Sequence, residues 1–169
     1  MIGVGALGIF VYWTQVMLPS VPRIHDISTD LVNPPPFVAL AELRTKLPQP
    51  VNPATYTPAF PAEQAKGYPD IKPAILSGAP DKVFPEALQA AEALGWHIVA
   101  QDAASGRIEA TQTSFWMGFT DDMVIRVQPA EAGKTRVDIR SESRVGQSDF
   151  GVNAKRVRLY LQKLQQIGG

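Results

Sequence analysis

Charged side chains alternate with apolar or small ones in the segment RVDIRSESR, at residues 136–144. Successive side chains of a β-strand point to opposite faces, so a strand here would gather the charged groups on one face. Those residues are Arg136, Asp138, Arg140, Glu142 and Arg144. Neighbours on that face lie about 6.7 Å apart, which places positive and negative groups in alternation. The guanidinium forks of such a ladder could bind a carboxylate or a phosphate.

An ion-pair lattice on an exposed sheet face is the more common role of such a ladder. Arg126 and Asp122, on the preceding predicted strand, could extend it through cross-strand pairs. Each exposed pair contributes about 0–1 kcal/mol, so the lattice would add little to the free energy of unfolding. We therefore expect an exposed lattice and keep anion binding as the alternative.

The segment VGQSDFGVN follows the ladder, where a strand gives way to a helix. Helix N-termini near glycines can bind anions, but Asp149 would repel one here. Neither GxxxxGK[ST] nor GxGxxG, the usual phosphate loops, occurs in the chain. We therefore expect Ser148 or Asp149 to cap the helix. The candidates for binding an anion or a partner are Arg126, Arg140, Arg144, Ser148, Asp149, Asn153 and Arg156.

Three aromatic residues and a methionine lie together in SFWMGF, at residues 114–119. Such side chains are favoured at protein interfaces and at membrane surfaces, although they could also line the core face of the sheet. The candidates for contact with a membrane or a partner are Phe115, Trp116, Met117, Phe119 and Trp13.

Metal binding and nucleophilic catalysis have little support. The segment HDISTD offers His25, Asp26 and Asp30 as weak metal candidates, without a second histidine motif to complete a site. With two histidines and no cysteine, the chain has no thiolate metal site, and no Ser–His–Asp triad can be assembled. We therefore expect no metal, no cofactor and no enzymatic activity.

The first eighteen residues, MIGVGALGIFVYWTQVML, contain no charged side chain. A helix of this length spans about 27 Å, close to the thickness of a bilayer core. A signal peptide would begin with Lys or Arg, and none is present. We expect residues 1–18 to form one transmembrane helix that stays attached, with a buried soluble helix as the alternative.

Thirteen of the fifteen prolines lie between Pro19 and Pro80. Because proline lacks a backbone donor, this stretch cannot be mostly helix or central strand. We expect residues 19–70 to be an extended arm lying along the folded domain, with one helical piece at 37–47.

From residue 71 to residue 169 the pattern is typical of a folded α+β domain. We expect a strand at 72–78, a helix at 81–95, four more strands and a final helix at about 149–166. The four strands are 96–102, 106–114, 122–128 and 134–143. This order, β-α-β-β-β-β-α, predicts an antiparallel sheet of four or five strands covered by two helices.

Three segments resemble a bacterial family catalogued as domain of unknown function 1499. They are GRIEATQTSFWMGFTDDMVIRV, TRVDIRSESRVGQSDFGVNAKRVR and VPRIHDISTDLVNPPPF. The pattern RSxSRVGxSDxGxNAxR is specific, and the resemblance covers most of the chain after residue 20. Family members often carry hydrophobic spans upstream, which is consistent with an N-terminal membrane helix and with a chain truncated before Met1. The resemblance implies fold and membrane association, but no activity.

The family pattern extends beyond the ladder and its junction with the last helix. It maps onto Arg107, Glu109, Asp121, Asp122, Arg126, Arg140, Ser141, Ser143, Arg144, Gly146, Ser148, Asp149, Gly151, Asn153 and Arg156.

We expect a non-enzymatic domain anchored in the bacterial inner membrane, with its soluble part in the periplasm. Its role would be that of an accessory or docking subunit of a larger inner-membrane complex. The expected partners are the lipid bilayer and an integral membrane protein complex. The net charge is zero, and we expect no nucleic-acid partner. The alternatives are binding of a lipid or small hydrophobic ligand between the sheet and the C-terminal helix and, less favoured, an enzyme acting on an anionic substrate.

Overall fold

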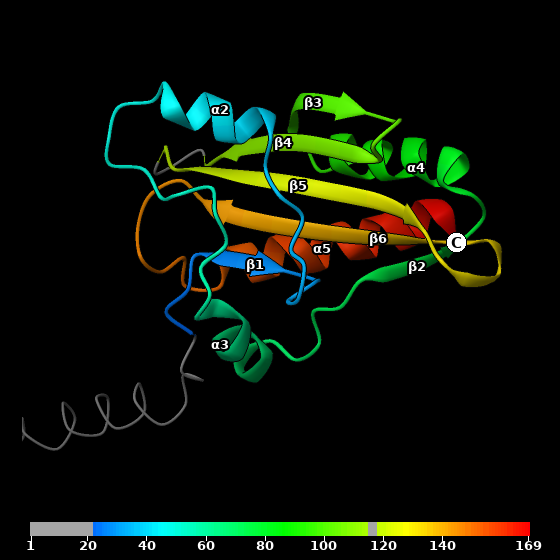
Figure 1. Cartoon of the computed structure of the whole chain (residues 1–169), viewed down its shortest axis with the longest axis horizontal. Coiled ribbons are helices and arrows are strands. Elements are labelled where there is room, and N and C mark those ends of the chain that lie inside the picture. The colour runs from blue at the N-terminus through cyan, green and yellow to red at the C-terminus, as the bar shows by residue number, and fades with distance from the viewer. Residues whose placement is uncertain (1–21, 115–117) are drawn as a thin grey trace, which may run out of the picture.

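A six-stranded antiparallel sheet organises the residues that the computed structural model describes, 22–114 and 118–169 (Figure 1). The strands are β1 (Asp26–Ser28), β2 (Ala74–Ser77), β3 (His97–Asp102), β4 (Arg107–Thr113), β5 (Thr120–Pro129) and β6 (Lys134–Ser143). The α-helices in this part of the chain are α2 (Ala39–Thr45), α3 (Phe60–Gly67), α4 (Pro80–Ala93) and α5 (Val152–Gly168). The predicted α+β class with an antiparallel sheet is confirmed.

Strand β6 is central to the sheet, whose order is β1-β6-β5-β4-β3. One edge of β6 pairs with β5 over residues 135–143. Its other edge is shared by two short strands, β1 opposite residues 140–142 and β2 opposite residues 134–137. The sheet therefore has six strands rather than four or five, because the proline-rich region contributes β1.

Helices α4 and α5 pack on one face of the sheet (Figure 1). In α5, apolar side chains recur every three or four residues and turn toward the strands, as in an amphipathic helix. Ala154, Val157, Tyr160 and Leu164 are fully buried. The Tyr160 ring stacks on Trp96, with 5.3 Å between ring centres. The space between the sheet and α5 is therefore largely filled by packed side chains.

The arm, which we define as residues 22–70, packs along the sheet and includes β1, α2 and α3. Phe37, just before α2, and Leu40, in its first turn, pack on Val124 of β5 and cover the face opposite α5. Ile24 and Ile27, around β1, are fully buried in the main hydrophobic core. The helical piece predicted at 37–47 is present as α2, whereas α3 was not predicted.

None of the helices in residues 22–114 and 118–169 is long and apolar enough to cross a membrane. The predicted transmembrane helix at 1–18, Trp13 included, lies outside the described residues. The same holds for Phe115, Trp116 and Met117. Phe119, the remaining aromatic residue of that segment, is about half exposed.

Gly106 closes the turn between β3 and β4 and is expected to tolerate no side chain. Its φ is +66°, and a Cβ there would collide with the main-chain oxygen of Val127. We expect Gly106→Ala to lower the free energy of unfolding by about 3 kcal/mol in urea denaturation of the full chain in mild detergent. Gly95→Ala is the matched control, because Gly95 has a φ of +73° and open space around it. The control should lose only about 1–2 kcal/mol, and equal losses would contradict a steric role for Val127.

Candidate functional site

Alternation along β6 directs its charged side chains toward the arm and its small ones toward α5. Arg140 contacts Asp26 of β1 beneath the arm, whereas Ser141 donates a hydrogen bond to Asn153 of α5. The predicted sharing of one face by the charged residues is confirmed. The predicted exposure of that face is wrong, because the arm covers it and leaves Arg140 and Glu142 only 2% and 1% exposed.

Arg140 binds three parts of the arm through one guanidinium. Its Nη2 lies 2.8 Å from Asp26 Oδ2 and 2.9 Å from the main-chain oxygen of Ala54. Its Cζ lies 4.6 Å from the ring centre of Phe37 and 5.3 Å from that of Tyr56. A guanidinium suits this position, because its edge pairs with carboxylates while its faces stack on aromatic rings. Arg140 therefore joins segments of the arm that are distant in sequence.

Arg44 and Arg144 extend this contact into a continuous network. Glu142 Oε2 lies 3.3 Å from Arg140 Nη2 and 2.8 Å from Arg44 Nη1. Asp122 accepts hydrogen bonds from Arg44 Nε at 2.7 Å and from Arg144 Nη2 at 2.8 Å. Together with the carboxylate of β1, this makes three guanidiniums and three carboxylates. The network, which we call the arm network, is thus neutral in charge when all six groups are ionised.

A second group of ion pairs lies farther along the same face. Asp30 and Asp138 each accept hydrogen bonds from both Arg126 and Arg136, at 2.9–3.0 Å. Arg126 also donates to the main-chain oxygen of Asn33 at 3.0 Å. The cross-strand extension predicted through Arg126 and Asp122 is therefore confirmed, and the arginines of the ladder are paired with carboxylates.

Glu109 of β4 holds the first turn of α2. Its carboxylate is buried and accepts hydrogen bonds from the N–H groups of Val38, Ala39 and Leu40, at 3.0, 3.1 and 2.8 Å. The first N–H groups of a helix lack partners within the helix and carry a partial positive charge. A carboxylate from a distant strand thus satisfies the start of α2, which has no cap of its own.

Two carboxylates of the arm network have raised pKa values. Burial raises the pKa of Glu142 from 4.5 to about 8, and the negative charge of Asp26 adds to the rise. The guanidiniums of Arg44 and Arg140 oppose it. Burial also raises the pKa of Asp26. Both carboxylates contact Arg140 Nη2, so a proton on one relieves their mutual repulsion. His25 Nε2 lies 4.0 Å from Glu142.

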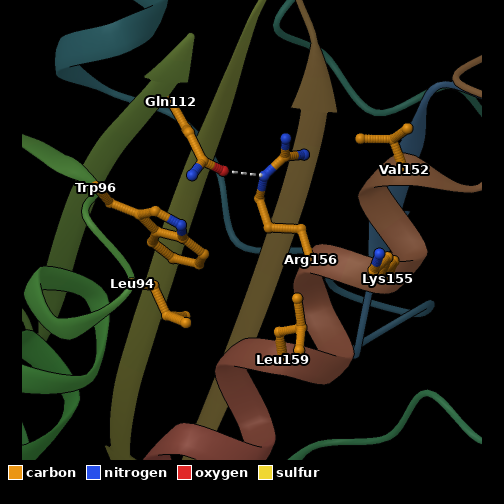
Figure 2. Close-up of a pocket in the computed structure, with 7 residues that line it drawn as sticks. All are labelled: Leu94, Trp96, Gln112, Val152, Lys155, Arg156 and Leu159. Carbon is orange, nitrogen blue, oxygen red and sulfur yellow. Dashed lines mark hydrogen bonds between the residues drawn. The ribbon is translucent and has the colours of Figure 1, made fainter. Parts of the chain in front are cut away.

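A separate polar cluster lies on the opposite face, under the start of α5. Asn153 Nδ2 donates to Ser143 Oγ at 2.8 Å. Arg156 Nη2 pairs with Asp121 at 2.6 Å. Its Nε donates to Gln112 Oε1 at 3.0 Å, as Figure 2 shows. Arg156 is therefore occupied by side chains of the sheet.

Asp149, not Ser148, caps α5. Its carboxylate accepts hydrogen bonds from the N–H groups of Gly151 at 2.9 Å and of Asn153 at 2.6 Å. Ser148 Oγ is 3.4 Å from the N–H of Phe150, outside the helix. The predicted capping is confirmed, and the Asp149 carboxylate occupies the place that an anion would take.

A shallow hollow of about 220 Å³ lies between the first turns of α5 and the start of β3 (Figure 2). Its lining is mainly apolar, with two cations on the α5 side. The lining residues are Leu94, Trp96, Gln112, Val152, Lys155, Arg156 and Leu159. Its volume is below the range of about 300–1,000 Å³ that is typical of pockets for drug-sized ligands.

A larger hollow of about 610 Å³ lies beside the first turn of α4, the turn at 103–106 and the end of β5. Asp81 is the charged side chain of its lining, which includes no histidine. Neither hollow therefore combines the acid, base and nucleophile that a hydrolytic site requires.

The sequence matches a family described as "Protein of unknown function (DUF1499)" over residues 26–164. The chain belongs to this family. The match begins at β1 and ends within α5, so the arm and the sheet are both parts of the DUF1499 domain. No curated protein matches the chain. Among solved structures, the crystal structure of TTHA0849 from Thermus thermophilus is similar at 16% identity, covering 56% of this chain and 84% of that chain with a TM-score of 0.28.

The predicted anion-binding residues of this DUF1499 domain do not converge. Arg126, Arg140 and Arg144 lie beneath the arm, whereas Asn153 and Arg156 lie across the sheet, under α5. The sheet thus divides the candidates into two groups, and each arginine already has a carboxylate partner. An anion would have to displace these partners.

The weak metal candidates are likewise separated. Asp26 faces Arg140, and Asp30 faces Arg126 and Arg136. In residues 22–114 and 118–169, no group of three His, Cys, Asp or Glu side chains could hold a metal ion.

Arg44 and Gln64 were missed as members of the buried polar system. Arg44 lies four residues after Leu40 and seven after Phe37, so it shares a helix face with apolar residues. A charge on an apolar helix face is the signal that could have revealed it. Gln64 exchanges two hydrogen bonds with the main chain of Ser28, and nothing in the local sequence indicates this.

Arg140 should be the most costly arginine to replace. We expect Arg140→Met to lower the free energy of unfolding by about 3–5 kcal/mol, because the buried carboxylates lose their shared partner. Urea denaturation of the full chain in mild detergent would measure this loss. Arg158→Met, which removes an exposed pair with Asp70, should cost less than about 1 kcal/mol. Comparable losses in the two variants would contradict the importance of the arm network.

Glu142 should make the protein less stable as the pH rises. The pKa of Glu142 in the folded protein is raised to about 8 from 4.5, so the folded state binds its proton more tightly than the unfolded state does. Its contribution to the free energy of unfolding is therefore fully present below pH 4.5 and is lost as the pH rises toward 8. We expect the Tm of the full chain to fall across this window, and Glu142→Gln to flatten the fall. The exposed Glu63, replaced by Gln, is the control and should leave the slope unchanged. A variant slope equal to that of the unmodified chain would refute the assignment to Glu142.

Proposed function

We propose that this DUF1499 chain is a non-enzymatic, membrane-anchored domain that docks onto a larger assembly in the bacterial inner membrane. The observation that carries the proposal is that the candidate anion-binding arginines are paired within the domain, whereas several large apolar side chains are exposed together at one end of it. The arginines that could have formed an open anion-binding site are paired with carboxylates inside the domain. Large exposed apolar side chains gather at the end where residues 1–21 join the described chain.

We call this end the tether end and define it as residues 22–25, 118–120 and 144–152. Main-chain hydrogen bonds connect its three segments. The N–H of Asp149 donates to the oxygen of Ile24 at 3.3 Å, and that of Arg144 donates to the oxygen of Thr120 at 3.1 Å. In Figure 1 the first described residues and the loop between β6 and α5 lie on the same side of the sheet's end. The segments therefore form one surface.

Half of the large exposed apolar side chains in the described part of the chain lie at the tether end. Of the eight such residues, those at this end are Phe119, Val145, Phe150 and Val152. Exposed apolar side chains that cluster mark contact surfaces, whereas isolated ones are common on any protein. This clustering beside the uncharged residues 1–18 supports docking at a membrane.

The main alternative is a carrier of lipid or a small hydrophobic ligand. A carrier needs an apolar cavity between the sheet and α5. That region is packed with fully buried side chains, and the hollow at its edge has a volume of about 220 Å³. An enzyme acting on an anion would need Arg140, Arg144, Asp149 and Asn153 to converge, and the sheet separates them. Docking is therefore the function that we favour.

Co-purification tests the proposal. We expect the full chain, extracted from native membranes in mild detergent and fractionated by size, to migrate well above an 18.4 kDa monomer in its micelle. Mass spectrometry should find partner proteins in a fixed ratio to the chain. Migration as a monomer without protein partners would contradict docking, and the extracted lipids would then be examined.

A control variant separates anchoring from docking. The double variant Ile9→Arg and Val11→Arg places two charges in the uncharged segment, which opposes membrane insertion by about 2.5–3.5 kcal/mol for each charge at the centre of a span. We expect this variant to leave the membrane fraction while its domain stays folded. Retention of the variant in the membrane would count against anchoring by residues 1–18.

A further inference from the structure

Phe150 is held outward by the backbone of the junction between β6 and α5. It is 84% exposed, and its φ of 53° lies in the left-handed region, as does that of Gly151. For a residue with a bulky side chain, this conformation costs about 1–2 kcal/mol. Asp149 stabilises it by accepting hydrogen bonds from the N–H groups of Gly151 and Asn153. The exposure of Phe150 is therefore imposed by a well-bonded turn.

The length of chain before the domain keeps Phe150 close to the segment predicted to enter the bilayer. Five residues separate Leu18 from Ile24, so their Cα atoms are at most about 22 Å apart. Ile24 in turn is hydrogen-bonded to Asp149, next to Phe150. A bilayer that holds residues 1–18 must therefore lie near the tether end.

The charges at the tether end favour an anionic surface. Arg23, at this end, and Lys155, in the first turn of α5 just beyond it, are exposed and have no ion-pair partner among the described residues. Residues 1–21 and 115–117 contain no acidic side chain that could pair with them. The nearby acids are occupied: Asp149 accepts main-chain N–H groups, and Asp121 and Asp122 pair with arginines. Apolar anchors beside unpaired cations are typical of surfaces that bind anionic lipid headgroups.

We propose that the tether end rests in the interfacial layer of an anionic bilayer, with Phe150 as its apolar anchor and Arg23 and Lys155 against the lipid phosphates. The inference rests on the proposed membrane anchorage and adds an orientation to it. The start of α5 faces the lipid, and the turn between β5 and β6 faces away. The acidic side chains nearest the tether end are already bonded to main-chain N–H groups or to arginines.

A single-cysteine label tests this orientation directly, because the chain contains no cysteine. Phe150→Cys carries an environment-sensitive fluorophore in the full chain, reconstituted in vesicles of phosphatidylcholine with phosphatidylglycerol. Val32→Cys is the matched control, since Val32 is 96% exposed and lies beside Asp30, which pairs with Arg136 near the other end of β6. We expect doxyl-labelled lipid to quench the label at residue 150 about twofold and to leave the label at residue 32 unquenched.

A charge variant tests the part played by the cations. Arg23→Gln with Lys155→Gln, in the Phe150→Cys chain, should reduce quenching in the anionic vesicles toward the level found in pure phosphatidylcholine. Quenching that is unchanged by these substitutions would overturn the role given to the phosphates. An unfolding midpoint equal to that of the unmodified chain would show that the variants remain folded.

The remaining outcomes distinguish this inference from the proposed anchorage. If the chain floats with the vesicles but aqueous iodide, not doxyl-lipid, quenches the label at residue 150, the orientation is wrong and anchorage stands. If the chain does not float with the vesicles, anchorage itself fails, and the inference fails with it. If the label is shielded in native membranes but not in vesicles of pure lipid, a protein covers the tether end and the lipid contact is refuted.

Discussion

Burying a guanidinium costs several kcal/mol unless carboxylates and other acceptors surround it, and Arg140 lies almost fully buried between the sheet and the arm. Its partners come from separate places in the arm: Asp26 in β1, Phe37 before α2, and Ala54 and Tyr56 in the following loop. Without the arm packed on the sheet, Arg140 and Glu142 would face solvent. The arm and the ladder on β6 therefore depend on one another: the arm buries the ladder, and the ladder supplies the charges that hold the arm.

The same dependence explains why a motif rich in Arg, Ser, Asp and Asn is not an open binding site. Residues adjacent in the motif point to opposite faces of β6, so Arg140 joins the arm while Ser141 joins α5 through Asn153. Asp149 then caps α5 and shapes the turn that presents Phe150. The residues of this DUF1499 motif bond to other parts of the same chain. The side chains available to a partner are therefore the exposed ones, such as Phe150.

The raised pKa of Glu142 makes the packing of the arm on the sheet depend on pH. Two carboxylates that share a guanidinium in a buried place are stabilised when one holds a proton, and docking of the arm is thereby linked to pH. The linkage therefore acts on the contact between the arm and the sheet, and through it on the free energy of unfolding.

Local patterns in the sequence were sufficient to predict the helices and strands from residue 71 onward. The alternation in RVDIRSESR determined which side chains share a face, and helical spacing determined the buried stripe of α5, because both depend only on neighbouring residues. Tertiary structure alone decided that the charged face is buried. That outcome depends on contacts such as Asp26 with Arg140 and Leu40 with Glu109, between residues far apart in the chain. A strand of three residues such as β1 is too short to carry a period of its own, so only its pairing with β6 reveals it.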